Sequence, residues 1–156
     1  MTTARSRIVD KTLATWVHCT SRCVRRAFLA GDRYEHRKAW LEERLQYLAR
    51  CFSAEVAGFA VMSNHLHVIV RMDPAAPFTW SDLEVARRWL SVYPRTYLSD
   101  GTPVLPSEAV IAVIAKDSAR VNLWRSRLAN LGWFMKAFRK LKDRHLVHRR
   151  GLRSHD

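Results

Sequence analysis

The sequence predicts an α+β fold, and three observations support this prediction. Short runs rich in β-branched and aromatic residues occur at 12–23, 54–62 and 65–72, as expected of strands. The stretch 34–52 instead repeats its apolar residues at spacings of three and four, which is the helical period. From residue 81 onward, helical patterns dominate. A set of strands followed by a run of helices indicates an α+β layout within one domain.

The first strand and the first helix are predicted from different residue types. Trp16, Val17 and Thr20 favour an extended conformation within 12–23, because such side chains pack well on a pleated surface. The stretch 34–52 places its large apolar residues on one face of a helix. These residues are Leu41, Leu45, Leu48 and Phe52.

The second and third strands are predicted to form a hairpin. Only Ser63 and Asn64 separate the runs 54–62 and 65–72, and Asn tolerates the positive φ that a two-residue turn requires. The hairpin would place residue 65 directly after the turn, at the start of the third strand.

Helix starts are marked later in the chain by residues that cap helix N-termini. Ser81 precedes a helical pattern that runs to about residue 90, and Ser107 precedes one that runs to about residue 115. Asp117 or Ser118 opens a third helix. A serine or aspartate side chain at this position accepts a hydrogen bond from a backbone N–H of the first turn.

The end of the chain is predicted to be a basic tail. Gly132 is expected to interrupt the third of these helices. A last helical pattern runs from Trp133 to about Leu146, with Phe134, Phe138 and Leu141 aligned. From residue 136 onward, however, eight Lys/Arg residues face only Asp143 and Asp156, and residues 149–156 have no core pattern. We therefore expect a domain over 1–135 and a disordered basic tail over 136–156.

The charge of the chain predicts a polyanionic partner. Its 156 residues include 27 Lys+Arg against 14 Asp+Glu, a formal charge of +13, and nucleic acid is the commonest partner for such an excess. An acidic membrane surface is a weaker alternative, since no long basic amphipathic helix stands out near the N-terminus. Arg22, Arg25 and Arg26 follow the first strand and could contact phosphates, or could simply be solvated.

Cysteine usage and hydropathy predict a cytoplasmic protein. The three cysteines (Cys19, Cys23 and Cys51) have no CxxC spacing, and an odd number argues against a disulfide framework. The first residues lead into no apolar segment typical of a signal peptide. No apolar run approaches the roughly 18 residues of a membrane span, so we expect no membrane association.

The most informative feature is a pair of histidines, His65 and His67, in the run VMSNHLHVIV at 61–70. Alternate residues of a strand share a face, so both imidazoles point the same way, roughly 6.5–7 Å apart along the strand. The intervening Leu66 and the following Val68 suit the opposite, buried face. The pair predicts a metal site, although two partly exposed histidines beside a turn would give the same spacing.

Other classes that use paired histidines fit this sequence less well. A cupin-like site requires a Glu a few residues later and then a Gly, but Arg71 and Asp73 follow here. An amidohydrolase-like pair lies nearer the N-terminus and needs many later ligands. A two-histidine phosphoesterase needs His-x-Thr/Ser twice, and only His18 with Thr20 supplies it. We interpret His18 as a structural histidine.

Residues 62–70, read MSNHLHVIV, resemble the histidine–hydrophobe–histidine signature of single-tyrosine transposases, in the branch associated with repetitive extragenic palindromes. Residues 20–29, 34–41, 80–90 and 131–135 resemble further stretches of that family. The similarity extends over most of the chain up to about residue 138.

The resemblance implies a fold and an activity. The family has a ferredoxin-like core, with an antiparallel sheet that carries the His-x-His strand, helices packed on one face, and extra C-terminal helices. By position, His65 and His67 would bind Mg²⁺ or Mn²⁺. The intact family cleaves and rejoins single-stranded hairpin DNA through a tyrosine nucleophile, commonly as a homodimer, so DNA is the expected partner.

The chain departs from the family at its nucleophile. The family's tyrosine lies on a helix near the C-terminus, but the last tyrosine here is Tyr97. Tyr93 and Tyr97 flank a proline-containing segment and are interpreted as surface loop aromatics. We therefore identify no catalytic residue. The departure predicts a truncated or frameshifted reading frame that lacks the tyrosine helix and the third metal ligand it supplies.

Three functions follow from these residues. The first is a transposase-like DNA-binding protein, which would be a DNA transposase or single-strand endonuclease if active. The second is a non-catalytic nucleic-acid-binding remnant, favoured by the missing tyrosine. The third, motivated by the histidine pair alone, is a metal hydrolase that does not act on DNA.

Overall fold

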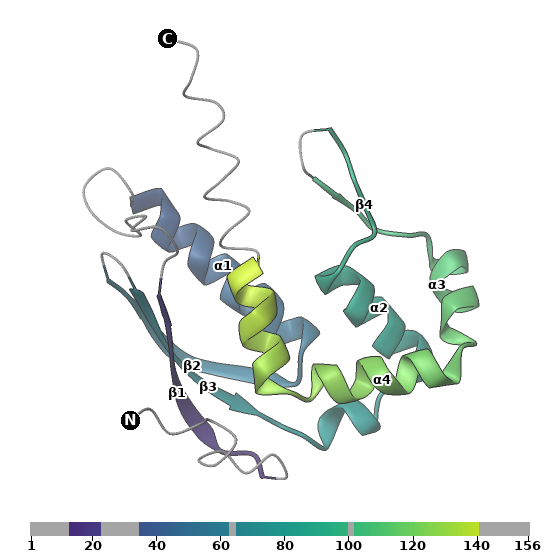
Figure 1. Ribbon diagram of the computed structural model, residues 1–156, viewed down its shortest axis with the longest axis horizontal. Helices are drawn as coiled ribbons and strands as arrows, with labels where there is room; N and C mark the ends of the chain where they lie inside the picture. The colour runs from purple at the N-terminus through teal and green to yellow at the C-terminus, as the bar shows by residue number, and fades with distance from the viewer. Residues whose placement is uncertain (1–12, 23–34, 63–64, 100–101, 141–156) are drawn as a thin grey trace.

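The computed structural model describes residues 13–22, 35–62, 65–99 and 102–140. A sheet packed against two helices, called the sheet layer below, lies at one end of the molecule. A group of further helices, called the helical lobe, lies at the other end (Figure 1). The predicted α+β fold is confirmed.

The sheet has three antiparallel strands in the order β1-β3-β2. They are β1 (Trp16–Arg22), β2 (Ala54–Val61) and β3 (His65–Met72). The predicted hairpin of β2 and β3 is therefore present, and its turn residues lie outside the described residues. Because β3 pairs with a strand on each side, it is the central strand of the sheet.

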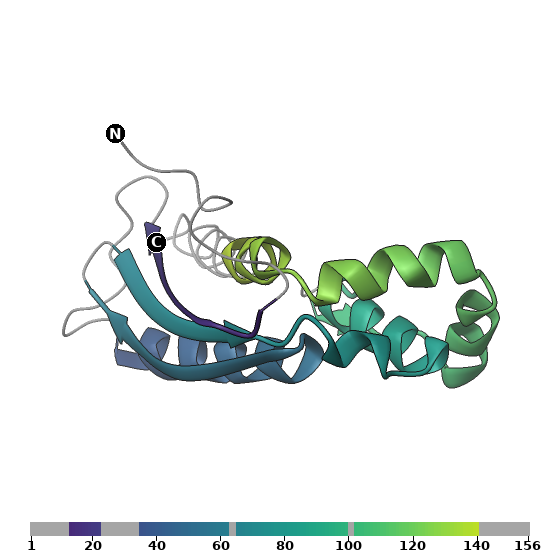
Figure 2. The same cartoon turned by 90° about the horizontal axis from the view of Figure 1, so that it is seen from below.

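Two helices cover the same face of this sheet (Figure 2). They are α1 (Glu35–Cys51), which connects β1 to β2, and a helix over 131–140. The order strand, helix, strand, strand, helix, with β3 between β1 and β2, matches the first five elements of a ferredoxin-like fold. A further strand beside β1 does not occur in the described part of the chain.

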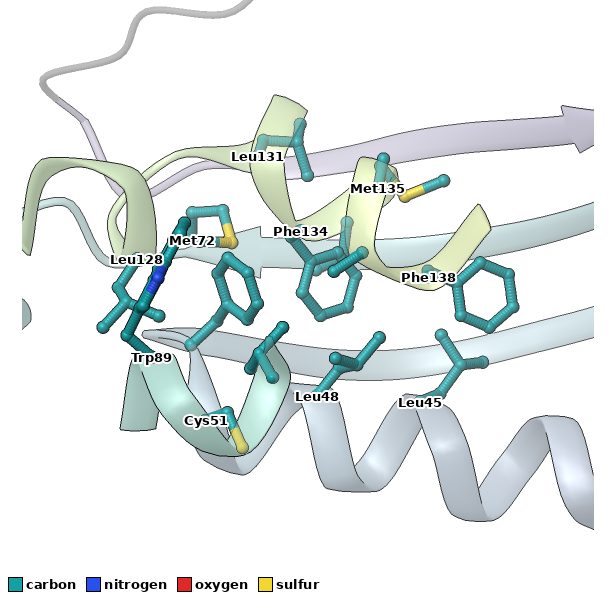
Figure 3. Close-up of a cluster of buried hydrophobic side chains, with 14 of the residues drawn as sticks. Leu45, Leu48, Cys51, Met72, Trp89, Leu128, Leu131, Phe134, Met135 and Phe138 are labelled. Carbon is teal, nitrogen blue, oxygen red and sulfur yellow. The ribbon is translucent and has the colours of Figure 1, made fainter. Parts of the chain in front are cut away.

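The core lies between the two helices and the sheet (Figure 3). Leu45 and Leu48 of α1 meet Phe134 and Phe138 of the helix over 131–140, and each of these side chains is at most 1% exposed. The sheet contributes Leu66, Val68 and Val70 of β3, which are completely buried. Strand alternation therefore directs the even-numbered residues of β3 into the core.

The helical lobe is inserted between β3 and the helix over 131–140. It contains η3 (Ala76–Phe78), α2 (Asp82–Val92), α3 (Glu108–Ala115) and α4 (Ser118–Leu128). The predicted caps are present: Ser81 Oγ accepts from Glu84 N at 3.2 Å and Ser107 Oγ from Val110 N at 3.5 Å. Asp117 caps α4. None of the described helices is both long and apolar enough to cross a membrane.

Two features of the later chain differ from expectation. The helix after α4 begins at residue 131 and not at Trp133, because Asn130 Oδ1 accepts from Gly132 N at 2.8 Å and caps the new helix. The residues interpreted as a loop before Ser107 include a small hairpin of β4 (Thr96–Tyr97) and β5 (Pro103–Val104).

The helix over 131–140 also crosses the expected boundary between domain and tail. Residues 136–140 were expected to begin a disordered tail, but they are helical, and Ala137 and Phe138 are 1% exposed. The helical alignment of Phe134 and Phe138 predicts this part of the helix, whereas the basic composition that indicates a tail does not reflect its buried face. Residues 141–156, the rest of the expected tail, lie outside the described residues.

Candidate metal and nucleic-acid site

Strand β3 presents His65 and His67 on the face of the sheet that the helices leave uncovered. Both side chains are half-buried, whereas Leu66 and Val68 between and beyond them are fully buried in the core. The two ring centroids lie 4.8 Å apart with planes inclined at 71°. The shared face predicted from the spacing of the two histidines is therefore present, and the imidazoles are neighbours.

Strand β1 adds two polar side chains to this cluster. Thr20 lies opposite His67 in the antiparallel register, and His18 lies opposite Ile69. His18 Nε2 is 2.8 Å from His67 Nδ1, and Thr20 Oγ1 is 3.5 Å from the same nitrogen. The His18 and His67 rings are close to parallel, at 17°, with centroids 5.0 Å apart.

The face beside these histidines is open and partly apolar. Ala60 of β2 lies opposite His67, and a Cβ added at Gly58, opposite Ile69, would meet no atom within 4 Å. Ile69 is 46% exposed and Trp16 is 50% exposed. An open surface of this kind leaves room for a ligand above the histidines.

The donor set fits an open metal site with two protein ligands. Imidazole nitrogens bind divalent transition ions, whereas Mg²⁺ prefers oxygen. Among the residues that the structure describes, no group of three or more His, Cys, Asp or Glu side chains is arranged to hold a metal ion. The pair would therefore leave coordination positions for water and for phosphate oxygens, and it suits Mn²⁺ better than Mg²⁺.

Of the three arginines expected to contact phosphates, the structure describes the backbone of Arg22. Arg22 is the last residue of β1 and pairs with His65, so its backbone lies beside the histidine pair. Its side chain, and all of Arg25 and Arg26, lie outside the described residues. Arg71, on the histidine face of β3, pairs with Glu55 at 3.5 Å.

The described tyrosines do not approach the histidines with a usable hydroxyl. Tyr47 donates its hydroxyl to the Ser91 carbonyl oxygen at 2.9 Å, and burial raises the pKa of this phenol. The Tyr93 hydroxyl is buried without a hydrogen-bond partner in the described residues, and burial raises its pKa as well. Tyr97 lies in β4, on the side of the molecule away from the sheet (Figure 1).

Tyr93 is therefore not the surface aromatic that its sequence context suggested. It packs against Trp89, with ring centroids 4.6 Å apart, and against Trp133 at 6.3 Å. Tyr97, which is 37% exposed, does lie at the surface. Trp124 is 6% exposed and belongs to the core.

Trp133 has a mixed environment. It packs against the core, but Arg127 and Lys136 lie over its ring, 4.4 and 4.5 Å from the centroid. Cations placed in this way occupy the ring face that a nucleobase would need. Trp133 is therefore a packing residue and not a platform for base stacking.

His18 belongs to the site although its sequence context indicates a structural histidine. Its side chain is exposed and forms a hydrogen bond with His67. The available signal was the spacing of His18 and Thr20, which repeats the alternation of His65 and His67. Each pair was identified in the sequence, but their juxtaposition depends on the pairing of β1 with β3.

Comparison with known proteins gives no independent identification: no family model, curated protein or solved structure matches this chain.

Proposed function

We propose that this protein is a transposase-like DNA-binding protein that uses His65 and His67 to hold a divalent metal against the backbone of single-stranded hairpin DNA. The observation that carries the proposal is the placement of two adjacent imidazoles on the open face of the central strand. The resemblance of residues 62–70 to the transposase signature supports the same assignment.

The net charge of the chain and two exposed apolar side chains on the sheet face support a nucleic-acid ligand. A net charge of +13 attracts a polyanion. The exposed side chains of Trp16 and Ile69 beside the histidines offer apolar contact to unpaired bases. A bound metal would polarise a phosphoryl oxygen and orient the phosphate.

The surroundings of the tyrosine hydroxyl groups favour a protein that binds DNA without cleaving it. A tyrosine nucleophile requires an accessible hydroxyl next to the phosphate that the metal holds. The Tyr47 hydroxyl donates a hydrogen bond to the Ser91 carbonyl oxygen, the Tyr93 hydroxyl is buried, and Tyr97 lies away from the sheet. Tyr34 lies outside the described residues. A non-catalytic nucleic-acid-binding function is therefore the form of the proposal that these contacts support best.

The proposal is tested with end-labelled hairpin DNA in the presence of Mn²⁺, on native and denaturing gels. We expect a shifted band on the native gel that weakens with chelator and with rising salt. The His67→Ala variant should bind more weakly. Val113→Ala is the control, because it removes an exposed apolar side chain of α3 in the helical lobe, away from the histidines, and should bind like wild type.

The denaturing gel distinguishes binding from cleavage. We expect no DNA adduct that survives SDS from the wild-type protein. Such an adduct, if lost in His67→Ala, would establish a tyrosine nucleophile and overturn the non-catalytic form. Absence of a native-gel shift at moderate salt would refute DNA binding itself, and hydrolysis of a small phosphodiester that DNA does not inhibit would favour a metal hydrolase.

A further inference from the structure

His67 is held at one ring nitrogen, and this contact determines which of its nitrogens can bind a metal. Both of its hydrogen-bonding contacts within the described residues are made at Nδ1, with His18 Nε2 at 2.8 Å and Thr20 Oγ1 at 3.5 Å. The His18 contact has the length of a good hydrogen bond, whereas the Thr20 contact lies at the limit of one.

Only one assignment of the shared proton leaves His67 able to bind metal through Nε2. A neutral imidazole carries one N–H, and its other nitrogen has the lone pair. If His67 donates from Nδ1, its Nε2 lone pair is available. If His18 donates from Nε2, the Nε2 of neutral His67 carries the proton and cannot bind metal. Metal-binding histidines commonly donate their second N–H to a neighbouring acceptor in this way.

We propose that His18 is a positioning residue: its Nε2 accepts the Nδ1–H of His67 and thereby fixes the tautomer and direction of the metal-binding ring. The metal-binding part of this inference rests on the proposed function, but the tautomer does not. His18 is not a third ligand in this arrangement, because its Nε2 lone pair cannot accept the hydrogen bond and bind a metal at the same time.

The position of His18 in the sheet is what makes this contact possible. His67 lies directly opposite Thr20, while His18 is the next residue on the same face of β1, opposite Ile69. The contact is therefore a diagonal one, which long or aromatic side chains can span. The exposure of His18 also means that a change there leaves the core untouched.

The test compares His18→Gln with His18→Leu. Gln places an amide oxygen the same number of bonds from Cβ as Nε2, so it can still accept from His67, whereas Leu cannot. In ¹⁵N NMR spectra recorded where the imidazoles are neutral, we expect the Nδ1–H tautomer of His67 in wild type and in His18→Gln. In His18→Leu we expect the mixed tautomers of a solvated ring.

Mn²⁺ binding by calorimetry supplies the second readout. Loss of a hydrogen-bond partner of this kind typically weakens metal affinity about 10–100-fold, so we expect this loss in His18→Leu and near-wild-type affinity in His18→Gln. Thr20→Val is the matched control and should change neither readout. Thermal melting of each variant reports whether the fold is retained.

The outcomes separate the two proposals. The role of His18 is overturned if His67 of the wild-type protein has the Nε2–H tautomer. It is also overturned if the tautomer changes in Thr20→Val and stays unchanged in His18→Leu. A loss of Mn²⁺ affinity in His18→Gln as large as in His18→Leu also overturns it, because it would make His18 a ligand. Wild-type protein that has the Nδ1–H tautomer but binds no Mn²⁺ supports the hydrogen bond and refutes the proposed metal function.

Discussion

Arg125 is a buried charge whose three partners join the parts of the helical lobe. Its side chain is 9% exposed, and it donates to the carbonyl oxygens of Pro77 and Trp80 and to Asp82 Oδ1, the last two at 2.6 Å. A buried guanidinium is tolerated when its donors are paired in this way. It therefore links α4 to η3 and to the first turn of α2.

Removal of this charge should destabilise the protein. Arg125→Met fills a similar volume but leaves two carbonyl oxygens and Asp82 without their donor. We expect a loss of about 3 kcal/mol in the free energy of unfolding, measured by urea denaturation. Arg120→Met is the control, because its ion pair with Asp117 is on the same helix but about half exposed, and it should cost less than about 1 kcal/mol. Equal losses would refute the role of Arg125.

At the scale of single residues, the candidate site could be predicted in part. The shared face of His65 and His67 follows from the period of a strand, because it is local geometry. The contact of His18 with His67 joins residues from two strands and depends on register, which a single sequence does not specify. Arg125 likewise carries no local signal, because its partners come from distant segments.

At the scale of elements, the sequence predicted strands and caps better than the end of the last helix. The predicted third strand, 65–72, coincides with β3, and the Ser81 and Ser107 caps are present. The helical pattern from Trp133 predicts the helix over 131–140 beyond residue 136, whereas the basic composition wrongly places the start of a tail there. Burial of Phe138 against α1 is a tertiary effect that charge composition does not reveal.

The helix over 131–140 should be essential to stability although it lies close to the end of the chain. Phe138→Ala would leave a cavity beside Leu45, and buried Phe→Ala changes cost about 3–5 kcal/mol. Lys136→Ala, on the exposed side of the same helix, is the control and should cost far less. Chemical denaturation of both variants measures the difference. A loss below about 1 kcal/mol for Phe138→Ala would contradict the observed packing.

At the scale of the whole molecule, the sheet layer and the helical lobe share one core. The buried cluster runs without a break from Val68 and Phe138 in the sheet layer to Val85 and Val121 in the lobe. Trp89 connects them, because it stacks on Trp124 at 5.8 Å and contacts Trp133 at 5.6 Å. Such continuity couples the two regions energetically, and the histidine face is supported by both.

The shared core predicts that both regions unfold together. The test uses a variant with Trp16→Phe and Trp40→Phe, whose remaining tryptophans all lie in the lobe or at its junction with the sheet. Their fluorescence reports unfolding of the lobe. The NMR signals of His18 and His67 report unfolding of the sheet. We expect the same urea midpoint from both probes, because an unfolded lobe would expose the apolar side chains that cover the sheet core. A lobe transition at clearly lower urea, with the histidine signals still native, would instead identify two independent units. The histidine face would then belong to a sheet layer that is stable by itself.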